Sequence, residues 1–102
     1  MKKKNFEITE NTVLKRNPEV QFSKIDNEVV LLSPDGTNYI RINEVGVRIW
    51  ELLEKELSYA DLIKKLLEEF EIDQGICETD VKSFLIKSIQ NQLISISSIT
   101  NF

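Results

Sequence analysis

The main change in the spacing of the apolar residues along this 102-residue chain falls at about Asn43, and a short alternating run over 93–96 could form a last strand or a wing-like extension. Before Asn43, from about residue 20 to residue 42, short apolar or alternating runs are separated by turn residues, which is typical of β-strands. After it, apolar residues recur every three or four positions, as they do on one side of an α-helix. The chain therefore predicts an α+β fold in which a small antiparallel sheet precedes helices.

Three strands are expected in the first half, over about 20–25, 29–32 and 38–42. The segment Asp26-Asn27-Glu28 favours a turn between the first two. Pro34-Asp35-Gly36 favours the second turn, because proline presets φ and glycine tolerates a positive φ. The three strands would form a β-meander, and the last of them would be an edge strand with unpaired N–H and C=O groups.

Two helices with clear start signals should follow the strands. Asn43 is a favourable N-cap for the first. Gly46 lies within its first two turns at a cost of about 1 kcal/mol relative to alanine, so we expect close packing against another backbone there. Trp50 is interpreted as a core residue. Ser58 is expected to cap the second helix, which runs to about Phe70 with its charged residues toward solvent.

The third helix has a less regular pattern. It is expected to begin at Thr79 or Asp80, after a loop over 71–78, and to end near residue 90 or 91. Its apolar residues spread over roughly 200° of the helix, which is wider than one packed surface requires. One stripe would face the core, and a partner or the terminal segments of the chain could cover the other. The second stripe contains Ile86, Ile89 and Leu93.

The length and the charge of the chain indicate how many domains it has, which partners are disfavoured and where in the cell it is expected. We predict an N-terminal extension over 1–13, one domain over 14–94 and a tail over 95–102. A net charge of −4 disfavours nucleic-acid binding, since lysine and arginine supply most of the affinity for phosphates. The lysines at 2–4 precede polar residues rather than the apolar run of a signal peptide, so we expect a cytoplasmic protein.

The residue types that carry most enzyme chemistry are scarce. The chain has no histidine, which excludes the commonest general base and any Ser-His or Cys-His pair. Cys77 is the single cysteine, so no intramolecular disulfide can form. We expect it just ahead of a helix as an inert thiol. The carboxylates fall on the solvated faces of the expected helices. We therefore expect no enzyme, no cofactor and no metal site.

Several segments in a fixed order resemble a known family. They are Lys15-Arg16-Asn17-Pro18, the hairpin over 29–36, Tyr39-Ile40-Arg41-Ile42-Asn43, Ile49-Trp50-Glu51-Leu52-Leu53, and the helical stretches 58–70 and 80–85. Together they resemble the PqqD family, also called the precursor peptide recognition element of ribosomally synthesised and post-translationally modified peptides (RiPPs). The resemblance covers about 14–94 and implies a winged helix-turn-helix-like fold. The family often has a glycine after the third helix, where this chain has Asn91-Gln92, and asparagine tolerates the same left-handed conformation.

The resemblance implies a non-catalytic adaptor. Family members bind the leader segment of a precursor peptide as a strand beside the third strand, over a groove walled by the third helix. They present the rest of the peptide to a modifying enzyme, such as a radical-SAM enzyme, a lasso-peptide leader peptidase or a cyclase. Backbone bonds would supply affinity and alternate side chains would supply specificity. The expected peptide-binding residues are Tyr39, Ile40, Arg41 and Ile42 on the strand, and Lys82, Leu85, Ile86 and Ile89 on the helix.

Each of these residues also suits a purely structural role. Ile40, Ile42 and Leu85 would fit the core equally well, and Tyr39 and Arg41 could be ordinary solvent-facing strand residues.

Two other functions remain open at this point. A winged-helix DNA-binding regulator would use the third helix, which offers Lys82, Lys87, Gln90 and Asn91 but no arginine. A small enzyme would have to rely on carboxylates or on Cys77.

Overall fold

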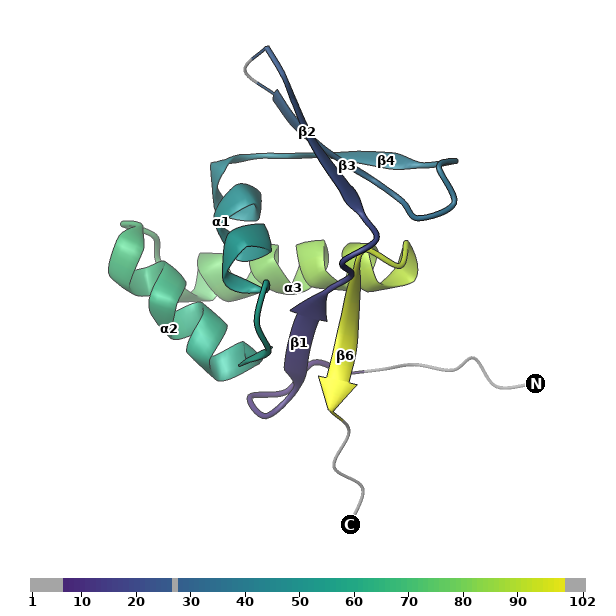
Figure 1. Ribbon diagram of the computed structural model, residues 1–102. Helices are drawn as coiled ribbons and strands as arrows, with labels where there is room; N and C mark the ends of the chain where they lie inside the picture. The colour runs from purple at the N-terminus through teal and green to yellow at the C-terminus, as the bar shows by residue number, and fades with distance from the viewer. Residues whose placement is uncertain (1–6, 27, 99–102) are drawn as a thin grey trace, which may run out of the picture.

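The computed structural model of the chain describes residues 7–26 and 28–98. The strands β2, β3 and β4 form one antiparallel sheet, and β5, β1 and β6 form a second one (Figure 1). Three helices pack beside the two sheets. The elements in chain order are β1 (Val13–Arg16), β2 (Gln21–Ile25), β3 (Glu28–Leu32), β4 (Tyr39–Ile42), α1 (Glu44–Leu52), β5 (Leu57–Ser58), α2 (Tyr59–Glu69), α3 (Gln74–Gln90) and β6 (Ile94–Ser98).

The predicted α+β class and the predicted β-meander are confirmed. In Figure 1 the β2-β3-β4 sheet lies across one end of α1 and above α3, and the β2-β3 hairpin projects beyond the helices. β3 is the central strand, and its Val29 and Leu31 are buried. β2 is exposed along its whole length, with Phe22 45% exposed, because the β2-β3 hairpin projects beyond the helices (Figure 1).

The second sheet joins the two ends of the described chain. β1 pairs with β6 on one side and with the short β5 on the other. The predicted domain limits of 14–94 stay a prediction, and the ordered structure continues past both of them. Ile8 is buried in the core, β1 begins at Val13, and β6 runs to Ser98.

Both predicted N-caps of the first two helices are confirmed. The Asn43 side chain accepts a hydrogen bond from Gly46 N (2.9 Å), and the Ser58 side chain accepts one from Asp61 N (3.1 Å). Each bond satisfies a backbone donor that the first helical turn leaves without a partner.

The predicted start of the third helix is wrong. α3 begins at Gln74, because the Asp73 carboxylate accepts a hydrogen bond from Ile76 N (3.1 Å) and caps the helix there. Thr79 and Asp80 therefore lie inside the helix and do not cap it. Cys77 is likewise inside α3 and 2% exposed, not in a loop ahead of it.

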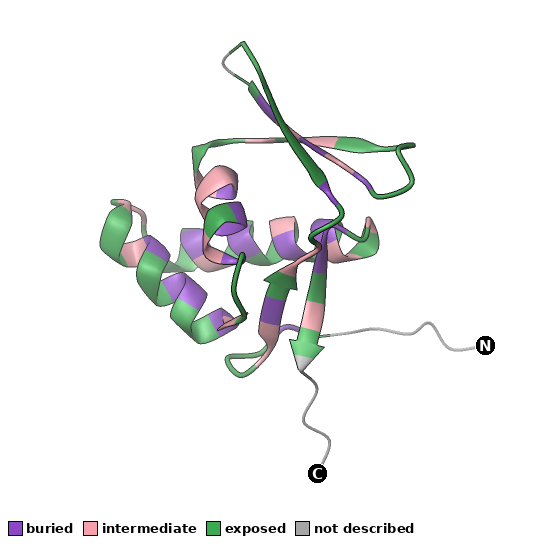
Figure 2. Cartoon of the chain, viewed as in Figure 1, coloured by how far each residue is buried: buried purple, intermediate pink, exposed green. Residues whose placement is uncertain are grey.

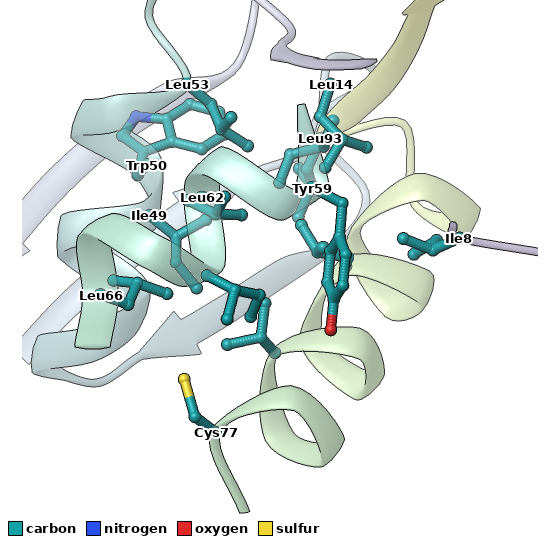
Figure 3. Close-up of a cluster of buried hydrophobic side chains, with 14 of the residues drawn as sticks. Ile8, Leu14, Ile49, Trp50, Leu53, Tyr59, Leu62, Leu66, Cys77 and Leu93 are labelled. Carbon is teal, nitrogen blue, oxygen red and sulfur yellow. The ribbon is translucent and has the colours of Figure 1, made fainter. Parts of the chain in front are cut away.

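The core lies where the three helices meet β1 and β6. Figure 2 shows that the buried residues gather on the inward sides of the helices, and Figure 3 shows the cluster itself. Leu14 from β1, Leu53 after α1 and Leu62 from α2 are fully buried. Trp50 belongs to this cluster and is 3% exposed, so its interpretation as a core residue is confirmed.

Gly46 explains how closely α1 follows β4. A Cβ at this position would lie 2.9 Å from Ile42 Cβ, a distance that real Cβ atoms do not reach. The expected close packing at Gly46 is present, but its partner is the Ile42 side chain and not another backbone. The missing Cβ lets the chain turn directly from the strand into the helix.

Candidate functional site

One edge of β4 pairs with β3, and no strand among the described residues pairs with its other, free edge. At the base of the β3-β4 hairpin Ser33 N donates to Asn38 O (2.9 Å), so these two residues form a hydrogen-bonded pair. Such pairs recur at every second residue of an antiparallel ladder. The register is continuous, and the next two bonded positions on β4 are Ile40 and Ile42.

Tyr39 and Arg41 alternate with these positions, so their N–H and C=O groups point away from β3. Their side chains lie on the outer face of the sheet, since Ile40 and Ile42 pack toward the core. Tyr39 is 63% exposed there. The Arg41 guanidinium lies 3.5 Å from a carboxylate oxygen of Glu28 on the same face. The open edge of β4 thus has four backbone hydrogen-bonding groups with which an extended peptide segment could pair.

The turn before β4 is held by the Asp35 carboxylate. It accepts hydrogen bonds from Ser33 Oγ (2.7 Å), Thr37 N (3.0 Å) and Thr37 Oγ1 (2.8 Å). These bonds lower the pKa of Asp35 to about 2, and the bond from Ser33 has the largest effect. Gly36 follows with a φ of 76°, which favours glycine. The predicted turn is confirmed, and it fixes where the free edge begins.

A cavity of about 190 Å³ opens between β4, α1 and α3. The residues that line it are mainly apolar, and three of them carry a charge or an amide. The lining residues are Arg41, Ile42, Asn43, Val45, Gly46, Ile49, Ile72, Cys77, Asp80, Val81 and Phe84. We call this cavity, together with the adjoining free edge of β4, the β4-α3 groove.

Charge and burial differ between the floor and the rim of the groove. Burial, and after it the charges of Glu78 and Asp80, raises the pKa of the Cys77 thiol. The thiol is therefore neutral and behaves as part of the apolar floor. Asp80 is exposed at the rim on the α3 side. The groove can cover an apolar side chain, and its rim can meet a charged one.

The structure brings together only part of the predicted site. Arg41 and Ile42 line the β4-α3 groove, and Tyr39 and Ile40 lie on the same strand. Leu85 is fully buried in the core instead. As a set of peptide contacts, the eight residues stay a prediction.

The other predicted helix residues lie outside the groove. Lys82 and Ile86 line a separate depression, about 160° around α3 from Phe84. Lys82 is placed over the ring of Tyr59, 5.5 Å from its centroid. Ile89 is half-buried beside β6, so for this residue the expected cover by a terminal segment is correct.

The sequence interpretation missed the α3 residues that do line the groove. The lining residues on α3 are Cys77, Asp80, Val81 and Phe84, and none of them is among the expected peptide-binding residues. The shifted helix start hid the first two. The available signal was the pair Asp73 and Ile76, which has the spacing of an N-cap and the N3 residue.

The comparison with protein families decides the class of this chain. The model of the family described as "Coenzyme PQQ synthesis protein D (PqqD)" matches residues 28–94, well over half of the sequence. The chain belongs to the PqqD family. The resemblance inferred from the sequence is thereby confirmed. The matched range of this chain includes β4, α1 and α3, and with them the whole lining of the groove.

Two solved structures share the fold of this PqqD-family chain. The first is TbiB1 in complex with the TbiA(beta) leader peptide, with a TM-score of 0.65 and 29% identity over 85% of this chain and 99% of that one. The second is lasso peptide synthetase B1 complexed with the leader peptide, with a TM-score of 0.65 and 23% identity over 80% and 96%. The second shows the fold alone. Among curated proteins, no sequence matches the chain.

These comparisons give no support to the DNA-binding alternative. Over residues 7–26 and 28–98, no group of three or more cysteine, aspartate or glutamate side chains is arranged to hold a metal ion. No helix in the same ranges is long and apolar enough to span a membrane.

Proposed function

We propose that this PqqD-family protein is a non-catalytic adaptor for RiPP biosynthesis. It binds the leader segment of a precursor peptide as an added strand beside β4 and presents the rest of the peptide to a modifying enzyme. The observation that carries the proposal is the free edge of β4 next to an apolar cavity. The similar structure of TbiB1, which contains a leader peptide, supports it.

Both halves of the groove are needed for binding. Association costs about 4–15 kcal/mol in lost freedom of motion. Backbone hydrogen bonds to Tyr39 and Arg41 would contribute only about 1 kcal/mol each, which does not offset that cost. Burial of an apolar leader side chain adds about 1.5–3 kcal/mol. We therefore expect affinity to depend on the cavity as well as on the strand edge, and specificity to come from the side chains that enter the cavity.

The wider setting of the proposal follows from the substrate. A precursor peptide is made by ribosomes and modified before export, so we place the adaptor in the cytoplasm. Its enzyme partner would be a radical-SAM enzyme, a leader peptidase or a cyclase. No cofactor and no nucleic acid take part in the binding step that we propose.

Proline substitutions test the strand half of the groove. Tyr39→Pro and Arg41→Pro each remove an N–H that points away from β3 and place a ring in the path of the incoming strand. We expect each to weaken binding of the leader peptide encoded beside this protein by about tenfold or more. Fluorescence anisotropy with the labelled synthetic leader measures the dissociation constant.

The opposite edge of the same sheet supplies a matched control. Ser23 pairs with Val30 through hydrogen bonds, so Lys24 N–H points away from β3 at the free edge of β2. Lys24→Pro makes the same chemical change there and should leave binding unchanged. If Tyr39→Pro and Arg41→Pro also bind like the wild type, strand addition beside β4 is wrong.

A pair of glutamate substitutions tests the helix half. Phe84→Glu puts a charge at the wall of the cavity and should weaken binding by more than about tenfold. Ile86→Glu makes a comparable change on the other side of α3, where we expect no effect on leader binding. The reverse outcome would place the peptide on the face of α3 that the sequence pattern first indicated.

A further inference from the structure

The rim of the β4-α3 groove carries one carboxylate without an ionic partner. Among the described residues, Asp80 takes part in none of the ion pairs. The other two polar side chains of the lining are already engaged. Arg41 is paired with Glu28, and the Asn43 oxygen caps α1. Asp80 is therefore the charged group of the lining that is left for a bound peptide to meet.

A strand added beside β4 would have two chemically different sides. Successive side chains of a strand point to opposite faces. On the outer face of the sheet they would meet Tyr39 and the Arg41–Glu28 pair. On the other face they would meet the apolar floor, including Phe84, and the Asp80 carboxylate. The same peptide side chain thus meets a neutral ion pair at one position and an unpaired carboxylate at the next.

Covering Asp80 without a partner is unfavourable. A peptide in the groove removes water from the carboxylate, and a carboxylate that loses water needs a cation or hydrogen-bond donors in exchange. The surrounding floor offers mainly carbon atoms. A lysine or arginine side chain suits this geometry, because its methylene stem can pack on the Phe84 ring while its charged end reaches Asp80.

We propose, resting on the leader-binding function above, that Asp80 is a specificity-determining residue that selects a lysine or arginine at a groove-facing position of the leader. That position is an even number of residues from the apolar side chain that enters the cavity. The proposal concerns which leaders bind, and strand addition itself does not depend on it.

The test is a set of synthetic leader peptides measured against the wild type and a charge-reversed variant. Each leader position receives in turn lysine, methionine (a similar stem without the charge) and glutamate. For the wild type we expect one groove-facing position at which lysine binds tighter than glutamate by on the order of tenfold, with methionine between them. Moving the lysine by one residue turns it to the Arg41 side and should remove the gain.

The Asp80→Lys variant should reverse the order at that position alone, so that glutamate binds best. Asp80→Asn should remove the preference without reversing it. Glu68→Lys, an equal change of charge on the exposed side of α2, should leave the order as in the wild type. Circular dichroism of each variant confirms that it is folded.

The outcomes separate this inference from the proposed function. If the wild type binds the leader but Asp80→Lys ranks the peptides as the wild type does, the role of Asp80 is overturned and leader binding stands. If Glu68→Lys reverses the order as well, long-range charge explains the preference and Asp80 does not. If the wild type binds no leader peptide, the proposed function fails together with the selection that rests on it.

Discussion

Replacing Gly46 with alanine tests the contact between β4 and α1 that shapes the groove. The added Cβ would lie 2.9 Å from Ile42 Cβ and 3.5 Å from Asn43 Oδ1. The first distance is well inside the optimum of about 3.5–4.0 Å for two carbon atoms. Ile42 Cβ is attached directly to the β4 backbone and cannot rotate away. The strand and the helix must therefore move apart.

Two opposing effects set the size of the change. Alanine is favoured over glycine by about 1 kcal/mol in a helix interior, and by less in the first turn, where Gly46 lies. Overpacking costs about 1–3 kcal/mol. We expect a net loss of about 1–2 kcal/mol in the free energy of unfolding, with a drop in Tm of about 4–8 °C for each kcal/mol. Since Ile42 lines the cavity, leader binding should weaken too.

The other two glycines of the chain provide the controls for this measurement. Urea and thermal unfolding followed by circular dichroism would compare all three alanine variants. At Gly75 the nearest atom is Asp73 Oδ2 at 3.2 Å, which can shift slightly but also caps α3, so we expect a smaller loss than at Gly46. At Gly36 there is space but φ is 76°, which isolates the cost of backbone strain. A Gly46→Ala variant as stable as the wild type would refute the steric argument.

Two further predictions concern charge and burial elsewhere in the fold. Arg48 Nε and Nη2 donate to the two Glu69 oxygens (2.7 and 3.0 Å), which joins α1 to α2 and lowers the pKa of Glu69. A lowered carboxylate pKa gives stability that is present above the ordinary value of 4.5 and is lost as the pH falls through the lower folded value. Arg48→Met should therefore unfold at a lower urea concentration than the wild type at neutral pH. If the two urea midpoints differ by as much at about pH 3, the ion pair with Glu69 is not the source of the difference. The Cys77 thiol, buried and with a raised pKa, should react with a thiol reagent far more slowly in the native protein than in urea, and equal rates would exclude its place in the groove floor.

Local signals in the sequence predicted much of the fold correctly. The caps at Asn43 and Ser58 and the turn around Asp35 each depend on residues within a few positions of one another, so the sequence alone contains the whole interaction. The start of α3 was misplaced for a local reason too. Gly75 resembles a loop residue, yet near a helix start it costs little, and the Asp73 cap decides the boundary.

The lining of the groove could be predicted only in part. The free edge of β4 follows from strand order, so Arg41 and Ile42 were found. The side of α3 that faces β4 depends on how the helix rotates when Leu85 enters the core, and the apolar pattern does not contain that rotation. The wide apolar arc of α3 arises because the core, the wall of the groove and β6 each use part of it, while Ile86 lies outside all three and is 37% exposed.

The pairing of β1 with β6 has a consequence for how the protein is made. Lys15 O and Ser95 Oγ, which are 80 positions apart, lie 3.4 Å from each other in this pair. β6 follows β1 by 80 positions at this contact, so β1 leaves the ribosome long before its partner strand has been made. Leu14 and Ile94, both buried where these strands meet the helices, remain exposed until then. The core therefore closes only after β6 has been made, and a nascent chain cannot hold a leader peptide on a finished domain before then.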